Sequence, residues 1–136
     1  MSGYSIMIVD DDTANADLIC RTLASAGYDQ IDTYGDGAKA FAMFQTKKYH
    51  IMLADIVMPE TDGIEFLRKV REYDPLTQVI VMAGRSTMDT ILTCLELGAN
   101  AYFLKPFKSA DDVLEAVNDS VKKLERWKEA MKGIIA

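Results

Sequence analysis

Acidic and basic residues stand at the ends of short apolar runs along this sequence. Asp10, Asp11 and Asp12 follow the run "YSIMIV". Asp55 ends the run "IMLAD", and Lys105 follows "AYFL". Carboxylates brought together raise one another's pKa and oppose folding unless a cation compensates. Because Mg²⁺ takes oxygen ligands and commonly uses one or two protein carboxylates, Asp10, Asp11 and Asp55 predict a magnesium site if these ends meet.

Asp55 is the candidate for chemistry at such a site. A carboxylate can attack phosphorus and form an acyl phosphate. Phosphoryl transfer then depends mainly on positioning and on neutralisation of charge. A lysine ammonium such as that of Lys105 can pair with a phosphoryl oxygen beside the metal. Pro59 helps to end the strand, and Gly63 begins the next helix where backbone close to the site must bend without a side chain.

The elements that must position these residues alternate regularly between strand and helix. The predicted strands are 4–10, 30–34, 50–55, 78–84 and 101–105, and the predicted helices are 13–27, 37–48, 63–73, 87–98 and 109–136. Five such units make a mostly parallel sheet with helices on both faces, so the fold class is α/β. Ligands of these sheets lie outside the carboxyl ends of the strands, where the charged residues fall.

The bulk properties of the chain favour a soluble, cytoplasmic domain. Its 136 residues suit one domain, and its net charge of −6 argues against a nucleic-acid-binding surface. Cys20 and Cys94 are far apart and fit reduced, inert thiols. The apolar runs are too short to span a membrane, and the first is too short for a signal peptide.

Three stretches give the sequence a specific resemblance. They are "VDDD" at 9–12, "DIVMPETDG" at 55–63 and "KPF" at 105–107. With these stretches, the chain resembles a response-regulator receiver domain of two-component signalling, roughly from Tyr4 to Val121. The resemblance implies a doubly wound, five-stranded parallel sheet of order 2-1-3-4-5 with five helices. We therefore expect a receiver domain over 1–121 and a helical extension over 122–136.

The resemblance also implies a role for each site residue. Asp55 is the expected phospho-acceptor, taking phosphate from a histidine kinase or phosphotransfer protein. Asp10 and Asp11 are expected to hold Mg²⁺ with Asp55 and the backbone carbonyl of Val57. Lys105 is expected to contact the phosphate, and its bond to the following proline is usually cis. The protein would be a phosphorylation-dependent switch of a partner or output and not an enzyme.

The sequence departs from the family at the end of the fourth strand. The family usually has Ser or Thr there, whose hydroxyl contacts the phosphoryl group, but this chain has Ala83. Ser86 and Thr87 lie three and four residues further on. Tyr102 fills the aromatic switch position of strand five. The phosphoryl chemistry is therefore expected to be complete, with weaker coupling of phosphate to switching.

Several other polar residues are expected to have structural roles instead of functional ones. Thr13 is a plausible N-cap of the first helix, and Asp12 is expected to be solvated or helix-capping instead of a metal ligand. Glu60 and Asp62 are expected in a turn. His50 opens the third strand at the end away from the site and is expected to be a surface histidine.

The C-terminal helix carries a pattern of its own. Apolar residues recur at three- and four-residue steps, with one lysine, at Leu114, Val117, Val121, Leu124, Lys128, Met131 and Ile135. The first half is expected to pack on the sheet, while the second half, from about Val121, has no sheet left to cover. The second half is then a dimerising helix or a linker to an output domain. The alternative is an ordinary long helix with Trp127 folded back on the domain.

Two other functions remain open from the sequence. The first is a phosphatase of the haloacid dehalogenase type, in which the acidic positions Asp10 and Asp12 match but Ala14 stands at the next key position. The second is a pseudo-receiver that only binds a partner, which Ala83 weakly favours. Uptake of phosphate from acetyl phosphate, or binding of beryllofluoride with Mg²⁺, separates these functions.

Overall fold

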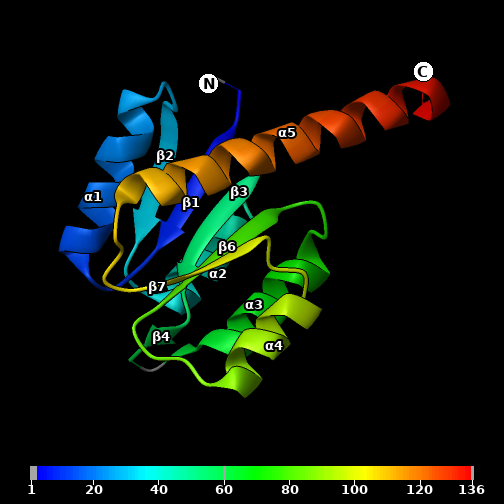
Figure 1. Cartoon of the computed structure of the whole chain (residues 1–136). Helices are drawn as coiled ribbons and strands as arrows, with labels where there is room; N and C mark the ends of the chain where they lie inside the picture. Colours follow the sequence, from blue (N-terminus) through cyan, green and yellow to red (C-terminus); the bar gives the residue numbers. More distant parts are fainter. Residues whose placement is uncertain (1–2, 60, 136) are drawn as a thin grey trace.

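The computed structural model describes residues 3–59 and 61–135, the last by its backbone alone, and shows a regular alternation of strands and helices (Figure 1). The expected turn residue Glu60 and the side chain of Ile135 lie outside the described part. In chain order the elements are β1 (Ser5–Val9), α1 (Thr13–Ser25), β2 (Gln30–Tyr34), α2 (Gly37–Phe44), β3 (Ile51–Asp55), β4 (Val57–Met58), β5 (Thr61–Asp62), α3 (Gly63–Tyr73), β6 (Gln78–Ala83), α4 (Met88–Glu96), β7 (Ala101–Leu104) and α5 (Ala110–Ile135).

The main sheet has the predicted topology. Its order is β2-β1-β3-β6-β7, and every neighbouring pair is parallel within the described residues. Counted along this sheet alone, the order is 2-1-3-4-5, so the expected α/β fold is confirmed. A second, antiparallel pair, β4 with β5, was not predicted from the sequence. It directly follows β3, where the chain leaves the sheet beside the candidate site.

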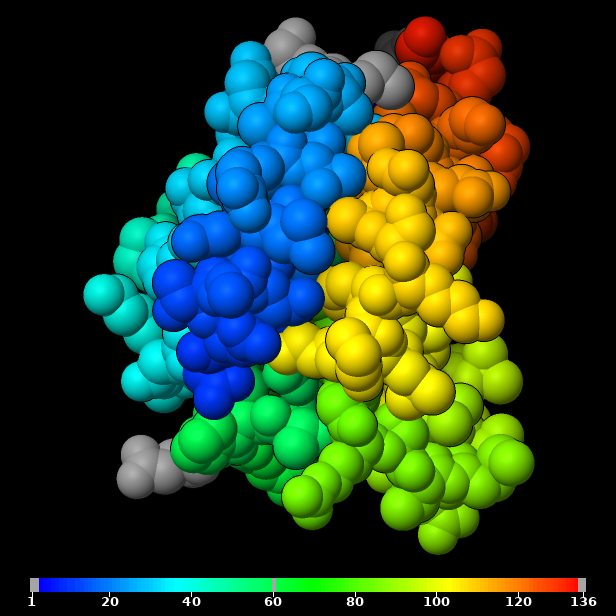
Figure 2. All heavy atoms as spheres, turned by 60° about the vertical axis from the view of Figure 1, so that its left-hand side comes forward, coloured from blue at the N-terminus to red at the C-terminus, as the bar shows by residue number. Residues whose placement is uncertain are grey.

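The helices cover the sheet in two layers. Helices α1 and α5 share one core cluster with the strands, to which they contribute side chains such as Ile19 and Val117. Helices α2, α3 and α4 form the other cluster through Phe44, Leu67 and Cys94. Figure 2 shows α1 and the first part of α5 side by side on their face. Because both faces are covered, β1, β3 and β6 are buried along their whole length, which explains their continuous apolar runs.

Aspartate side chains cap the first and third helices, so the helix-capping role expected for Asp12 is confirmed and the one expected for Thr13 is wrong. Asp12, and not Thr13, is the N-cap of α1, and its carboxylate accepts a hydrogen bond from the backbone N–H of Asn15 at 3.2 Å. Asp62 is likewise the N-cap of α3, with the N–H of Glu65 at 3.1 Å. Both carboxylates satisfy backbone donors that have no partner within the helix.

His50 is half-buried instead of lying freely on the surface. Its Nδ1 accepts a hydrogen bond from the backbone N–H of Ser5 at 3.0 Å, and its ring makes a T-shaped contact with the ring of Tyr4. Burial is the main cause that lowers the pKa of His50, with Lys48 and Lys128 adding to it. The imidazole therefore holds β1 and β3 together in its neutral form.

Helix α5 continues well beyond the sheet (Figure 1). Its contact with the domain reaches further than predicted, because Leu124 is still buried at 7% exposed. Lys128 Nζ then lies 5.0 Å from the ring centroid of Tyr4. Trp127 is 51% exposed, which argues against the alternative in which its side chain folds back on the domain. The division into 1–121 and 122–136 stays a prediction. Among the described residues, no helix is both long enough and apolar enough to cross a membrane.

Candidate functional site

The register of the sheet brings the two key carboxylates together. Val9 of β1 pairs with Ala54 of β3, so the residues that follow them, Asp10 and Asp55, are neighbours at the carboxyl edge. Lys105 comes directly after β7 at the same edge. The predicted meeting of these strand ends is therefore confirmed, and it follows from the parallel direction of the strands.

Lys105 lies between the two carboxylates. Its Nζ is 2.7 Å from Asp55 Oδ2 and 3.0 Å from Asp10 Oδ1. The side chains of Asp10 and Asp55 are only 0% and 4% exposed, and that of Lys105 is 15% exposed. Burial, which lowers the pKa of Lys105, is outweighed by its hydrogen bonds to Asp55 and Asp10, so the pKa is raised and the lysine stays an ammonium. Two buried negative charges thus share one positive charge.

Burial disfavours the ionised form of Asp55, while hydrogen bonds orient its carboxylate. Burial raises the pKa of its carboxyl, and the hydrogen bonds from Lys105 and from the Val57 N–H only partly oppose this. Oδ1 accepts the Val57 N–H at 2.7 Å, while Oδ2 faces Lys105. Both oxygens are therefore held at the open edge of the sheet, and the ionised form would gain from a further cation.

Asp10 is oriented by a residue that the sequence analysis did not single out. Its Oδ2 accepts a hydrogen bond from Asn15 Nδ2 at 2.6 Å, and its Oδ1 accepts the N–H of Asp12 at 2.9 Å. Asn15 lies in the first turn of α1, which Asp12 caps. In the sequence, the one signal that could have pointed to Asn15 was its position three residues after Asp12, a candidate helix-capping residue.

The acidic residues fit a hard divalent cation. Asp10, Asp11 and Asp55 each offer a carboxylate oxygen, and these oxygens lie within 4.8 Å of one another. Asp11 is exposed, so a cation bound there could keep water ligands, as Mg²⁺ does. The Val57 N–H points to Asp55, and the expected role of the Val57 carbonyl as a ligand stays a prediction.

Ala83 provides no hydroxyl at the end of β6, and the hydroxyl of Tyr102 contacts Ser86 instead. Ala83 is fully buried as the last residue of β6, and its carbonyl accepts the Lys105 N–H at 2.9 Å. Tyr102 is half-buried on β7, and its hydroxyl lies 2.5 Å from Ser86 Oγ. The structure thus pairs Tyr102 with the loop before α4 through a residue to which the sequence analysis gave no role.

A cavity of about 550 Å³ opens beside the site. It is lined by the residues after Asp55, the start of α3 and the loop before α4, namely Ile56, Val57, Thr61, Asp62, Gly63, Ile64, Arg85, Ser86, Thr87 and Thr90. The cavity thus separates the residues that follow Asp55 from the loop before α4, and neither Asp55 nor Lys105 lines it.

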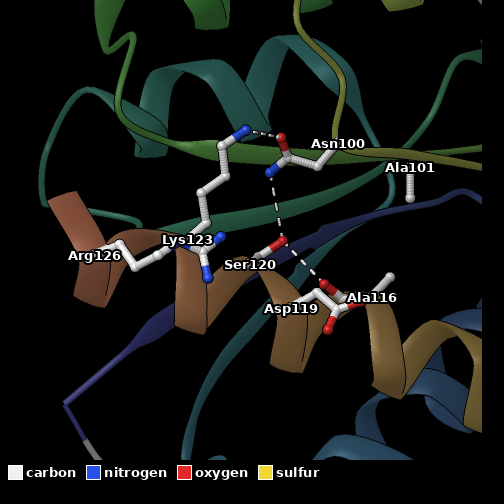
Figure 3. Close-up of a pocket in the computed structure, with 7 residues that line it drawn as sticks. All are labelled: Asn100, Ala101, Ala116, Asp119, Ser120, Lys123 and Arg126. Atoms are coloured by element: carbon white, nitrogen blue, oxygen red, sulfur yellow. Dashed lines mark hydrogen bonds between the residues drawn. The ribbon is translucent and has the colours of Figure 1, made fainter.

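A smaller cavity of about 220 Å³ lies at the opposite edge of the sheet, between β7 and α5 (Figure 3). There Lys123 donates to Asn100, and Asn100 donates to Ser120 Oγ at 3.4 Å. Ser120 in turn donates to the carbonyl of Ala116. These polar groups hydrogen-bond with one another, and the cavity lies away from the carboxylate cluster around Asp55.

Known proteins share both the sequence pattern and the fold. The family described as "Response regulator receiver domain" matches residues 6–118. Chemotaxis protein CheY of Bacillus subtilis is 29% identical over 119 residues, which cover 88% of this chain and 98% of CheY. The transcriptional regulatory protein TrcR of Mycobacterium tuberculosis is 34% identical over 106 residues, which cover 78% of this chain and 41% of TrcR. The chain thus spans less than half the length of TrcR.

Solved structures agree with these relatives. A CheY-like response regulator receiver domain protein from Methanospirillum hungatei JF-1 superposes with a TM-score of 0.85 at 28% identity, covering 90% of this chain and 97% of that one. The BeF3-activated receiver domain of DrrB gives a TM-score of 0.77 at 26% identity, covering 88% and 97% of the two chains. The family match covers most of the sequence, and the fold agrees with it. The chain belongs to the response regulator receiver domain family of two-component signalling.

Proposed function

We propose that Asp55 accepts a phosphoryl group from a phosphohistidine of a histidine kinase or phosphotransfer protein, and that the aspartyl phosphate switches a partner or output. The observation that carries the proposal is the Asp55 carboxylate, buried at a sheet edge 2.7 Å from the Lys105 ammonium and beside Asp10 and Asp11. A buried carboxylate of raised pKa, flanked by acidic neighbours, is a poor arrangement for stability alone.

In the proposed step, a carboxylate oxygen of Asp55 attacks phosphorus in line with the histidine nitrogen. An O–P bond forms, the P–N bond breaks, and the imidazole leaves with the electron pair of that bond. Lys105 is near enough to exchange its contact with Asp55 for one with a phosphoryl oxygen. The Val57 N–H holds the other carboxylate oxygen, which fixes the direction of attack.

Asp10, Asp11 and Asp55, with the Val57 carbonyl, would hold Mg²⁺ at this site. A bound Mg²⁺ would neutralise charge on the phosphoryl oxygens. Asn15 and the N–H of Asp12 would keep Asp10 turned toward the site. Since the phosphoryl group ends on the protein itself, we propose a signalling switch and not an enzyme. The free thiols Cys20 and Cys94 support a cytoplasmic location.

We also propose that α5 beyond Leu124 mediates association with a second copy. Trp127 and Ile134 are 51% and 85% exposed, and Ala130 lies between them on the same side of the helix. An exposed apolar stripe of this kind on a projecting helix is favourable for helix pairing.

Binding of beryllofluoride, a mimic of the phosphoryl group, tests the site. With Mg²⁺ present, the parent protein should bind it, and Asp55→Asn should not. Asp62→Asn is the matched control, because Asp62 is an exposed carboxylate whose capping role asparagine can take over. If the parent binds no beryllofluoride, the chain is a pseudo-receiver and the proposal is wrong.

A further inference from the structure

The missing hydroxyl at Ala83 raises the question of what holds Tyr102. Ala83 ends β6 and is fully buried, so no polar side chain at that strand end can reach either a phosphoryl group or the tyrosine. The Tyr102 hydroxyl lies 2.5 Å from Ser86 Oγ, and either oxygen could donate the proton. Ser86 thus supplies to Tyr102 a hydroxyl contact that the strand end lacks.

Ser86 lies on the loop that joins β6 to α4. The loop runs from Gly84 to Thr87, the N-cap of α4. A Cβ added at Gly84 would meet no atom within 4 Å, so the space around the start of the loop is open. Tyr102, in contrast, belongs to β7, pairs in register with Val81 and packs against the core cluster of α2, α3 and α4. The hydroxyl pair therefore connects the loop before α4 to a strand of the sheet.

The same loop lies across a cavity from the residues that follow the proposed acceptor Asp55. Arg85 and Ser86 line the 550 Å³ cavity together with Val57, two residues beyond Asp55. Arg85 is exposed, and no ion pair is present for it among the described residues. Negative charge added at Asp55 would attract its guanidinium, and Ser86 would move with its neighbour.

We propose that the Ser86–Tyr102 hydroxyl pair is the switch contact of this receiver: it holds Tyr102 in place before phosphorylation and is released when the loop Gly84–Thr87 moves toward the phosphoryl group. Ser86 is then a positioning residue that acts through Tyr102. This inference rests on the proposed function, because it needs an anionic group on Asp55 as the trigger. The net contribution of one hydrogen bond corresponds to a population change of about two- to tenfold.

The test follows the Tyr102 ring by carbon–proton NMR in protein labelled on its tyrosine rings. The chain has 6 tyrosines, and the Tyr102 signal is assigned by its loss in Tyr102→Phe. In the parent, Mg²⁺ with beryllofluoride should move this signal. In Ser86→Ala the signal should already be displaced toward that position without beryllofluoride, and Ser86→Thr should restore the parent position. Thr93→Ala is the control, because its hydroxyl bonds only within α4 to the carbonyl of Asp89.

The affinity for beryllofluoride is a second readout, and the inference predicts the direction in which Ser86→Ala changes it. If binding has to break the hydroxyl pair, Ser86→Ala should bind beryllofluoride as tightly as the parent or up to about tenfold more tightly. An unchanged Tyr102 signal in Ser86→Ala, or weaker binding that Ser86→Thr restores, would overturn the inference. A parent that binds no beryllofluoride would instead contradict the proposed function, and the signal of unliganded Ser86→Ala would still decide whether the pair holds Tyr102.

Discussion

Asp55, the proposed phospho-acceptor, is buried at the carboxyl edge of the sheet. Lys105 supplies the only close positive charge among the described residues, and it is shared with Asp10. Burial raises the pKa of Asp55 against the pull of Lys105 and of the Val57 N–H. The folded protein therefore holds a carboxylate whose ionised form is less stable than it would be in water, which suits a site completed by a cation.

Replacing Asp55 with asparagine should stabilise the fold at neutral pH. Because the pKa of Asp55 is raised in the folded state, its ionised form opposes folding above that pKa. As the pH falls through the raised pKa toward the ordinary value of aspartate, the parent gains stability and the advantage of the variant should shrink. Thermal unfolding without Mg²⁺ at pH 7 and at pH 4 measures this. A less stable variant at pH 7 would show that the ion pair with Lys105 outweighs burial.

Asn15 should affect metal binding although it is not a predicted ligand. Asn15→Ala removes the hydrogen bond that orients Asp10, and such second-sphere changes typically lower metal affinity by about 10- to 100-fold. Asp11→Ala should weaken Mg²⁺ binding as well. Titration with Mg²⁺ measures both, with Asn118→Ala as a control, since Asn118 contacts Tyr28 away from the site. Unchanged affinity in Asp11→Ala would refute its assignment as a ligand.

The site could be predicted from sequence only as far as strand ends define it. Asp10, Asp55 and Lys105 each follow an apolar run, and parallel strands bring such positions to one edge. Asn15 lies in the first turn of a helix, and Ser86 lies in the loop before α4. Neither position is marked by a periodic sequence pattern. The contacts of Asn15 with Asp10 and of Ser86 with Tyr102 depend on tertiary packing, which the sequence alone does not show.

Among the elements, the short β4–β5 pair decides how the chain passes from the site into α3. Val57 pairs with Asp62, and Gly63 follows as the first residue of α3. A Cβ at Gly63 would lie 2.0 Å from the carbonyl oxygen of Ile56, well inside contact distance. The prediction that glycine begins this helix because backbone lies close is therefore confirmed.

Gly63→Ala should be strongly destabilising. The added methyl meets backbone, which cannot move without displacing the residues after Asp55, so we expect a loss of about 1–3 kcal/mol or more and weaker beryllofluoride binding. Gly133→Ala is the matched control, because no atom lies within 4 Å of its added Cβ and the helix should gain about 0.5–1 kcal/mol. Equal unfolding free energies in the two variants, measured in urea, would contradict the steric account.

The elements could be predicted well where their patterns were long. The apolar runs of β1, β3 and β6 and the helical spacing of α3 marked them clearly. The β4–β5 pair has only two residues in each strand, too few for an alternating pattern to show. The burial of His50 was also missed, because its partner Ser5 lies on a neighbouring strand.

Across the whole molecule, charge is divided unevenly between the domain and the end of α5. Residues 122–136 contain five basic and two acidic residues, a net charge of +3, whereas residues 1–121 contain ten and nineteen, a net charge of −9. The end of α5 projects from the sheet (Figure 1). Trp127 on this part of the helix is 51% exposed. The projecting helix is thus both basic and partly apolar.

Trp127→Glu should weaken self-association, if the end of α5 pairs with a second copy. Two basic helices repel each other, so dimerisation of the parent should strengthen as salt screens this repulsion. Sedimentation at low and high salt measures both effects, with Leu18→Glu on α1 as a control for an exposed apolar residue elsewhere. A parent that is monomeric at high salt and at high protein concentration would contradict the dimer proposal.

Locating the phosphoryl group on the modified protein tests the proposed role of Asp55. The protein is incubated with acetyl phosphate and Mg²⁺, the acyl phosphate is reduced with borohydride, and the modified residue is found by peptide mass spectrometry. We expect modification at Asp55 that depends on Mg²⁺ and is absent from Asp55→Asn. Modification at another residue, or none in the folded parent with Mg²⁺ present, would contradict it.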